Sequence, residues 1–175
     1  TGEYYIAIIV EKQIEISVVK TNEIGIDVGI KDFAICSNGE RFNNQKILKK
    51  YEIKLQKKQK SLSKKKKGSK NRQRARMVVA KIHKKIKNSR IDYIHKLSNK
   101  ITNENQVIVL EDLNIKGMMK NHKLAKSIGD VSWHEFNRQL EYKSKWKGRE
   151  IIKIDRFFPS SKTCNTCGFL NKALT

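Results

Sequence analysis

Two carboxylates in apolar, β-prone runs are the residues of this sequence best suited to chemistry. Asp27 stands between two glycines in the run 24–30, and Glu111 closes the apolar part of the run 107–113. β-Branched residues favour extended backbone, and glycines let another backbone or a ligand approach closely. An ionised carboxylate in apolar surroundings is costly unless a cation or hydrogen-bond donors compensate it, so the sequence predicts a buried strand with a partner for Asp27.

A divalent metal ion is one candidate for that partner. The run 107–113 has the pattern of a central strand covered on both faces, and it can lie beside the strand that holds Asp27. Asp27 and Glu111 would then converge, and paired carboxylates are the ligands that magnesium and manganese prefer. For Asp27 taken alone, a strand-end residue hydrogen-bonded to a turn is an equally open interpretation. For Glu111 we favour the interpretation as a metal ligand. Asp112 is explained equally well as a solvated residue at the end of the strand.

The charge of the chain indicates a polyanionic partner. The 39 Lys+Arg residues against 17 Asp+Glu give a formal net charge of +22 and a pI of about 10.0, so the chain repels itself unless a polyanion neutralises it. We expect that polyanion to be nucleic acid and not a membrane. The lysine-rich segments lack the Trp/Phe/Leu face of an interfacial helix, and no apolar run approaches the ~18 residues that cross a bilayer.

The densest positive charge lies in a predicted helical hairpin over residues 46–101. Two narrow apolar stripes at helical spacing are separated by Gly68 and Ser69, which break the chain between them. We expect the cations near the tip to bind a phosphate backbone in a salt-dependent, sequence-independent way, although a solvated lysine-rich surface is the alternative. These cations are Lys57, Lys58, Lys64, Lys65, Lys66, Lys67, Lys70, Arg72, Arg74 and Arg76.

The other elements follow from hydrophobic periodicity and turn residues. We expect a strand hairpin from 5–10 and 14–19, and then three antiparallel strands that begin at 24–30 and turn at Asn38-Gly39. A polar loop is expected at 117–121. Ser132 is predicted to cap a helix that turns Trp133, Phe136 and Leu140 inward and stops at Gly148, and 150–155 is predicted as a third central strand.

The three cysteines do not indicate a disulfide framework, because their number is odd and Cys36 lies far from the other two. Cys36 is most simply a small core residue. Cys164 and Cys167 form a C-x-x-C pair, which can be redox-active, but no thioredoxin-like βαβ context surrounds it.

Five runs resemble the RuvC-like domain of the TnpB (OrfB) proteins of insertion sequences, relatives of the type V CRISPR effectors. In chain order they are GIDVGIKDFA, SLSKKKKGSKNRQRAR, VIVLEDLNIKGM, LAKSIGDVSW and DRFFPSSKTCNTCG, and the resemblance covers residues 23–170. It implies an α/β fold of the ribonuclease-H-like (RuvC-like) type, with a mixed sheet and an inserted basic helical hairpin. The expected organisation is the end of a preceding β (wedge-like) domain at 1–22, the nuclease domain at 23–159 and the first half of a zinc ribbon at 160–175.

The resemblance also implies an RNA-guided DNA endonuclease, whose partners are a guide RNA and a target DNA. Asp27 and Glu111 match the first and second catalytic acids of the family. In the complete enzyme, two magnesium or manganese ions about 3.5–4 Å apart would activate water and stabilise the leaving oxygen. Cys164 and Cys167 match the first half of a structural zinc ribbon.

The carboxyl end departs from the family pattern. The family takes its third catalytic aspartate from a helix after the ribbon, and this sequence stops at Thr175 before reaching it or the second cysteine pair. We therefore expect the chain as given to bind zinc and magnesium weakly. Because Thr1 is not an initiator methionine, we also expect the chain to be a piece of something longer.

Two further hypotheses remain open. The chain could be a truncated, non-catalytic relic of the same fold that binds RNA or DNA, and a histone-like or ribosomal basic protein would explain the charge but not the two acids. No signal peptide is evident, so we expect a cytoplasmic protein, associated with the nucleoid in a prokaryotic host. The sequence specifies no oligomeric state.

Overall fold

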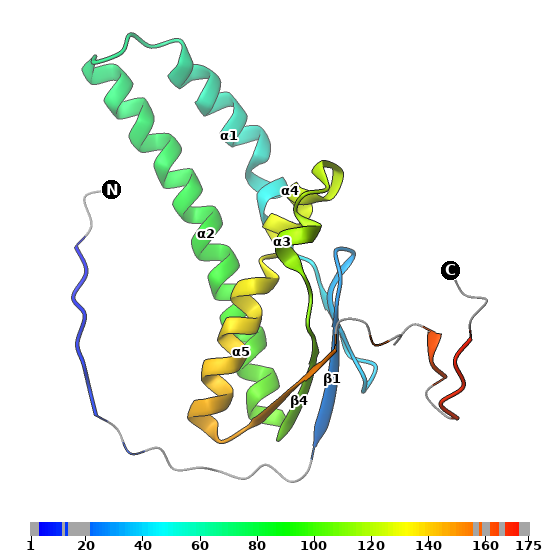
Figure 1. Ribbon diagram of the computed structural model, residues 1–175. Helices are drawn as coiled ribbons and strands as arrows, with labels where there is room; N and C mark the ends of the chain where they lie inside the picture. The colour runs from blue at the N-terminus through cyan, green and yellow to red at the C-terminus, as the bar shows by residue number, and fades with distance from the viewer. Residues whose placement is uncertain are drawn as a thin grey trace.

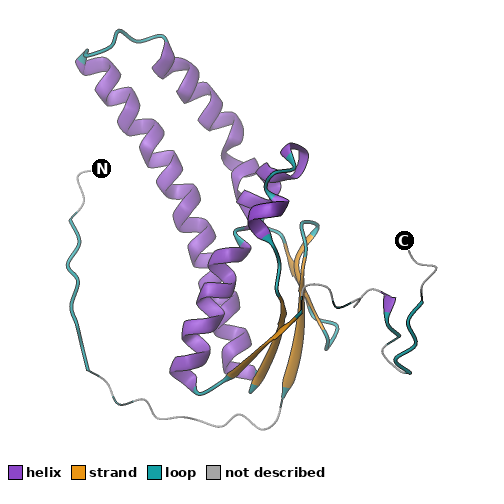
Figure 2. Cartoon of the chain, in the orientation of Figure 1, coloured by secondary structure: helices purple, strands orange, loops and turns teal. Residues whose placement is uncertain are grey.

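The computed structural model describes residues 4–11, 13, 22–155, 158, 162–164 and 167–171. Five strands and five helices occur in this part of the chain, and Figures 1 and 2 show their arrangement. They are β1 (Glu23–Val28), β2 (Asp32–Cys36), β3 (Arg41–Asn43), α1 (Ile47–Ser63), α2 (Lys70–Glu104), β4 (Val107–Glu111), α3 (Ile115–Met118), α4 (His122–Val131), α5 (Trp133–Lys147) and β5 (Glu150–Ile154).

The strands form one mixed sheet in the order β3-β2-β1-β4-β5. The strands β1, β2 and β3 are antiparallel neighbours, which confirms the predicted three-stranded opening of the domain. The chain then crosses over through the helical hairpin so that β4 lies parallel to β1, and β5 lies parallel to β4. The α/β class with a mixed sheet is therefore confirmed.

One face of the sheet carries the core. Ile24 and Ile26 of β1 and Ile108 and Leu110 of β4 are buried on this face, where α2, α4 and α5 cover them. Figure 2 shows the helices on one side of the strands. Because side chains alternate along a strand, the residues between these four lie on the opposite face, which no described helix covers.

The helical hairpin of α1 and α2 projects from this globular part (Figure 1). Its own small core contains the buried side chains of Ile47, Leu55, Ile82 and Ile86. Gly68 makes the turn with a φ of 82°, a conformation that glycine adopts without strain. Ser69 then caps α2, because its side chain accepts a hydrogen bond from the Arg72 amide at 3.2 Å.

A polar seam joins α2 to α5. The Lys143 ammonium, on a side chain that is only 4% exposed, donates to the Ser98 hydroxyl at 2.7 Å and to the His95 carbonyl at 3.0 Å. The seam also contains the buried amide of Gln139. Burial, together with the nearby positive charge of Lys147, lowers the pKa of Lys143 to about 8.

Two expectations near the ends of the chain are wrong in the structure. The predicted strand at 5–10 has no regular structure, and its side chains are exposed. A β-prone run forms a strand only when a neighbour pairs its backbone groups, and no described strand pairs with this one. Its predicted partner at 14–19 lies outside the described residues. The strand β5 lies at the edge of the described sheet and not at its centre.

The polar loop predicted at 117–121 is also wrong in part, because α3 ends and α4 begins within and beside it. Asn114 and Asn121 are the N-caps of these helices, and their side chains accept hydrogen bonds from the amides of Gly117 at 2.9 Å and Lys123 at 3.0 Å. The two asparagines could have predicted the starts of α3 and α4, since asparagine is among the best N-cap residues.

The helix α5 has the predicted boundaries and core face. Trp133, Phe136 and Leu140 are buried, and Gly148 ends the helix with a φ of 64°. Ser132 occupies the N-cap position, but its side chain makes no capping hydrogen bond and instead donates to the Gly129 carbonyl at 3.1 Å. Among the described residues no helix has the length and hydropathy of a membrane span.

Candidate functional site

Asp27 and Glu111 occupy neighbouring positions on adjacent parallel strands. Ile26 of β1 pairs with Leu110 of β4, and the next residue along each strand is the acid. Adjacent strands lie about 4.8 Å apart, so no side chain of a third strand comes between the two acids. The same cross-strand row continues to Ile35 on β2, which pairs with Asp27, and to Ile154 on β5, which pairs with Glu111.

The two acids lie on the uncovered face of the sheet and not in the core. Asp27 is exposed and Glu111 is half-buried, so the expected buried setting of Asp27 is wrong, as is the expectation that described elements cover β4 on both faces. The physical reason is strand alternation, which directs Ile26 and Leu110 into the core and the acids away from it. This setting leaves Asp27 exposed to solvent and Glu111 partly so.

Two carboxylates supply only part of the coordination shell of a divalent ion. In the described parts of the chain, no three His, Cys, Asp or Glu side chains are close enough together to hold a metal. The donors that are present are hard oxygen ligands, which fit magnesium or manganese and do not fit a soft metal.

Cys164 and Cys167 lie in a small turn closed by backbone hydrogen bonds. The Cys164 amide donates to the Phe169 carbonyl at 2.8 Å, and the Gly168 amide donates to the Cys164 carbonyl at 2.9 Å. Gly168 has a φ of 71°, which favours glycine. Both cysteines are exposed, whereas Cys36 is buried in the sheet, where burial raises the pKa of its thiol to about 11. The turn therefore presents a thiol pair at the surface.

The predicted nucleic-acid-binding cations surround the tip of the hairpin. Eight of the ten are exposed, whereas Lys65 and Arg72 are half-buried. None of the ten forms an ion pair with a carboxylate in the described residues. The reason is visible in the sequence, which has no Asp or Glu between Ile53 and Ile91. The hairpin tip is thus an uncompensated positive surface.

Arg72 differs from the other nine cations because it is part of the hairpin turn. Its Nη1 donates to the Leu62 carbonyl at 3.1 Å and to the Lys65 carbonyl at 3.0 Å. These carbonyls belong to the last turn of α1 and the residues after it, where helical partners run out. Arg72 therefore closes the tip, a role that the sequence analysis missed.

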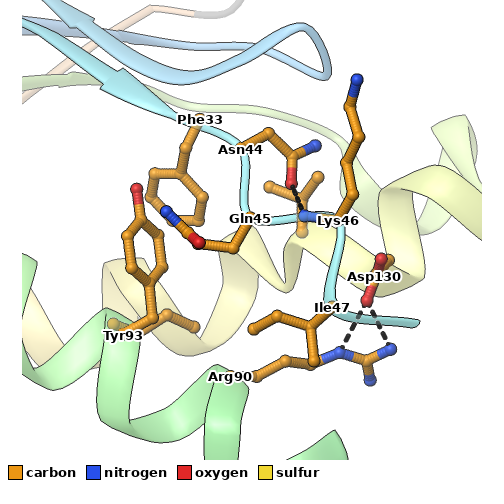
Figure 3. Close-up of a pocket in the computed structure, with 10 residues that line it drawn as sticks. Phe33, Asn44, Gln45, Lys46, Ile47, Arg90, Tyr93 and Asp130 are labelled. Carbon is orange, nitrogen blue, oxygen red and sulfur yellow. Dashed lines mark hydrogen bonds and ion pairs between the residues drawn. The ribbon is translucent and has the colours of Figure 1, made fainter. Parts of the chain in front are cut away.

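The base of the hairpin is fastened by Asp130 of α4. Both carboxylate oxygens of Asp130 accept a hydrogen bond from the Leu48 amide at 3.0 Å, at the start of α1. Arg90 of α2 donates to the same carboxylate through Nε at 2.9 Å and Nη2 at 2.7 Å (Figure 3). An anion at a helix N-terminus is also stabilised by the helix dipole. One carboxylate thus links α1, α2 and α4.

Comparisons with known proteins identify the family. The family model OrfB_IS605, described as "Probable transposase", matches residues 7–122, and the model "Cas12f1-like, TNB domain" matches residues 133–175. Since the first match covers more than half of the chain, the protein belongs to the OrfB_IS605 family of insertion-sequence proteins, to which the TnpB proteins belong.

Curated relatives carry names that state a function. A "Putative RNA-guided DNA endonuclease" of Streptomyces pristinaespiralis is 43% identical over 167 residues, which cover 95% of this chain and 42% of the relative. "Putative RNA-guided DNA endonuclease InsQ" of Escherichia coli (strain K12) is 30% identical over 187 residues, which cover 98% of this chain and 46% of the relative. The chain thus spans less than half the length of these two relatives.

A solved structure shares the fold. The chain superposes on a chain of the cryo-EM structure of a Cas12f1-sgRNA-target DNA complex with a TM-score of 0.54 and 22% sequence identity. The match covers 85% of this chain and 39% of the other.

Proposed function

We propose that this chain carries the ribonuclease-H-like (RuvC-like) nuclease core of a TnpB-type RNA-guided DNA endonuclease. The observation that carries the proposal is the position of Asp27 and Glu111, side by side on the uncovered face of the sheet. The family membership and the names of the relatives support the same function.

In this proposal Asp27 and Glu111 hold magnesium or manganese on the uncovered face. When bound, such ions supply Lewis-acid activation of water and of the scissile phosphate. Asp27 and Glu111 contribute the negative charge that retains the ions, and further ligands come from outside the described residues. The uncovered face leaves room for a phosphodiester beside the two acids, along the cross-strand row that also contains Ile35 and Ile154.

The basic hairpin binds the nucleic-acid backbone in this proposal. Its exposed cations lie at the end of two long helices, and Asp130 fixes the base of those helices against α4. Phosphate contacts of this kind supply affinity without reading sequence, which suits an enzyme whose target is chosen by a guide RNA. Guide RNA and target DNA are thus the proposed partners.

We also propose that Cys164 and Cys167 supply two thiolates of a structural zinc ribbon. The C-x-x-C spacing and the exposure of both thiols support this proposal, and the other two ligands would come from a second pair.

Cleavage by the full-length native protein tests the nuclease proposal. With guide RNA, target DNA and magnesium, Asp27→Asn and Glu111→Gln should each lower cleavage by at least a hundredfold and leave target binding unchanged, because both substitutions keep the side-chain shape and remove only the charge. Glu23→Gln is the matched control, since Glu23 is exposed on β1 and lies on the same face as Asp27.

Retained cleavage in either acid variant would reject the catalytic assignment. Tight target binding by the wild-type protein without cleavage under any divalent metal would identify a non-catalytic nucleic-acid-binding member of the family.

A further inference from the structure

The solvent-facing side of α5 carries an unusual run of a cation and two aromatic residues. Arg138, Tyr142 and Trp146 follow one another at spacings of four residues, so they lie on one face of the helix. The opposite face holds the core residues Phe136 and Leu140. The side chains of Arg138, Tyr142 and Trp146 therefore point away from the core.

The contacts within this run order it. The Arg138 guanidinium carbon lies 5.4 Å from the centre of the Tyr142 ring, and Glu135 accepts hydrogen bonds from Arg138 at 2.7 and 2.9 Å. The Tyr142 and Trp146 rings contact each other with centroids 4.6 Å apart and an interplanar angle of 62°. Tyr142 thus holds the indole against one side of the helix.

Trp146 nevertheless remains 57% exposed, whereas the other tryptophan of the chain, Trp133, is 2% exposed. An ordered indole that stays open to solvent offers a flat surface for stacking. Proteins bind unpaired bases by stacking them on aromatic side chains of this kind.

The charges around the indole favour an anionic ligand. The two acids on this face are already paired, Glu135 with Arg138 and Glu141 with Lys153 at 2.7 Å. Lys145, three residues after Tyr142 on the same side of the helix, is exposed and has no carboxylate partner in the described residues. The aromatic surface therefore lies next to uncompensated positive charge, the combination that follows the backbone of a single strand.

We propose that the α5 stacking face, defined as Arg138, Tyr142, Lys145 and Trp146, binds an unpaired strand of nucleic acid, with a base stacked on Trp146 and a phosphate near Lys145. The ligand is an unpaired strand because the bases of a duplex already stack on each other and are not available to a side chain on a helix surface. The proposal deepens the proposed function, since it assigns a second nucleic-acid contact far along the chain from the hairpin tip.

Tryptophan fluorescence and binding measurements on the 175-residue chain test this face. Single-stranded oligo-dT and oligo-U of equal length, and a duplex, are the probes. Addition of either single strand should quench the solvent-exposed part of the tryptophan emission, and Trp146→Leu should remove that quenching. Leucine keeps an apolar contact with Tyr142 and loses only the stacking surface.

The affinity measurement separates stacking from phosphate contacts. Trp146→Leu should weaken single-strand binding by about tenfold at every salt concentration without changing the salt dependence, because stacking releases no counterions. Ile53→Ala is the matched control, since Ile53 is an apolar residue that is 69% exposed on α1 and offers no aromatic ring for stacking. This control should bind as the wild type does.

Unchanged single-strand affinity in Trp146→Leu would overturn the proposal, and so would an equal loss of duplex affinity. A change in oligomeric state on gel filtration without a change in affinity would also overturn it and would show that the face contacts protein. If the wild-type chain binds duplex through the hairpin but single strands do not quench the Trp146 fluorescence, only this inference fails. If the chain binds no nucleic acid at all, the proposed function fails with it.

Discussion

Arg90 and Asp130 form an ion pair at 2.7 Å that joins two elements 40 residues apart in the sequence. The Asp130 side chain is 11% exposed and that of Arg90 is 23% exposed, so water screens the pair only weakly. Because the same carboxylate accepts a hydrogen bond from the Leu48 amide in the first turn of α1, this pair sets where the basic hairpin leaves the globular part.

Asp130→Asn should therefore lower the free energy of unfolding by about 2–3 kcal/mol in urea denaturation, because it leaves a largely buried guanidinium without its counter-charge. Asp92→Asn is the control. Asp92 pairs with Lys96 at 2.8 Å in an exposed position on α2, and its loss should cost at most about 0.5 kcal/mol. Equal stability losses in the two variants would contradict the role of Asp130 as an anchor.

Arg72 and Arg74 should separate structure from binding at the hairpin tip. Arg72→Ala should speed hydrogen exchange of the amides at 62–66 severalfold, because the carbonyls of Leu62 and Lys65 lose their donor. Arg74→Ala should leave exchange unchanged and should lower the salt slope of nucleic-acid binding by about one. If Arg72→Ala weakens nucleic-acid binding but leaves hydrogen exchange at 62–66 unchanged, Arg72 does not close the tip.

Lys143 should give the protein an alkaline increase in stability. Below pH 8 the folded and unfolded chains both hold the proton, and between pH 8 and the ordinary lysine pKa of 10.5 only the unfolded chain does. Stability rises with pH wherever the unfolded state binds more protons. The stability of the wild type relative to Lys143→Met should thus increase by up to about 3 kcal/mol across this range, as measured by denaturation at several pH values. A flat or falling difference would show that Lys143 is not buried as described.

Zinc content tests the interpretation of the cysteine turn. Two thiolates do not complete a structural zinc site, so this chain should keep well under one equivalent of zinc after dialysis. Elemental analysis of the wild type and of the double variant Cys164→Ser, Cys167→Ser should agree. A stoichiometric zinc that disappears in the double variant would instead require ligands that the described residues do not contain.

The sequence indicated that β1 could lie beside β4 because both strands are short apolar runs that carry an acid. It did not predict which face the acids occupy. Gly25 and Val109 lie on the same face as the acids, and neither residue type distinguishes a covered face from an open one. The runs therefore look buried on both sides although only alternate residues enter the core.

The roles of Arg72 and Asp130 had no signal in the sequence. Arg72 donates to backbone carbonyls, which every residue has, and it stands among cations that face solvent. Asp130 meets its partners only after α2 and α4 have packed together. Contacts of this kind follow from tertiary structure and not from local propensity, whereas the hairpin itself follows from its periodic apolar stripes.

Manganese is the most direct probe of whether Asp27 and Glu111 share a divalent ion. In NMR spectra of the 175-residue chain, substoichiometric Mn²⁺ should broaden the amide signals of Asp27, Glu111 and their row neighbours Ile35 and Ile154 before any others. Asp27→Asn should then reduce the broadening at Glu111. Broadening centred on other acids, or broadening at Glu111 that does not depend on Asp27, would contradict the shared site.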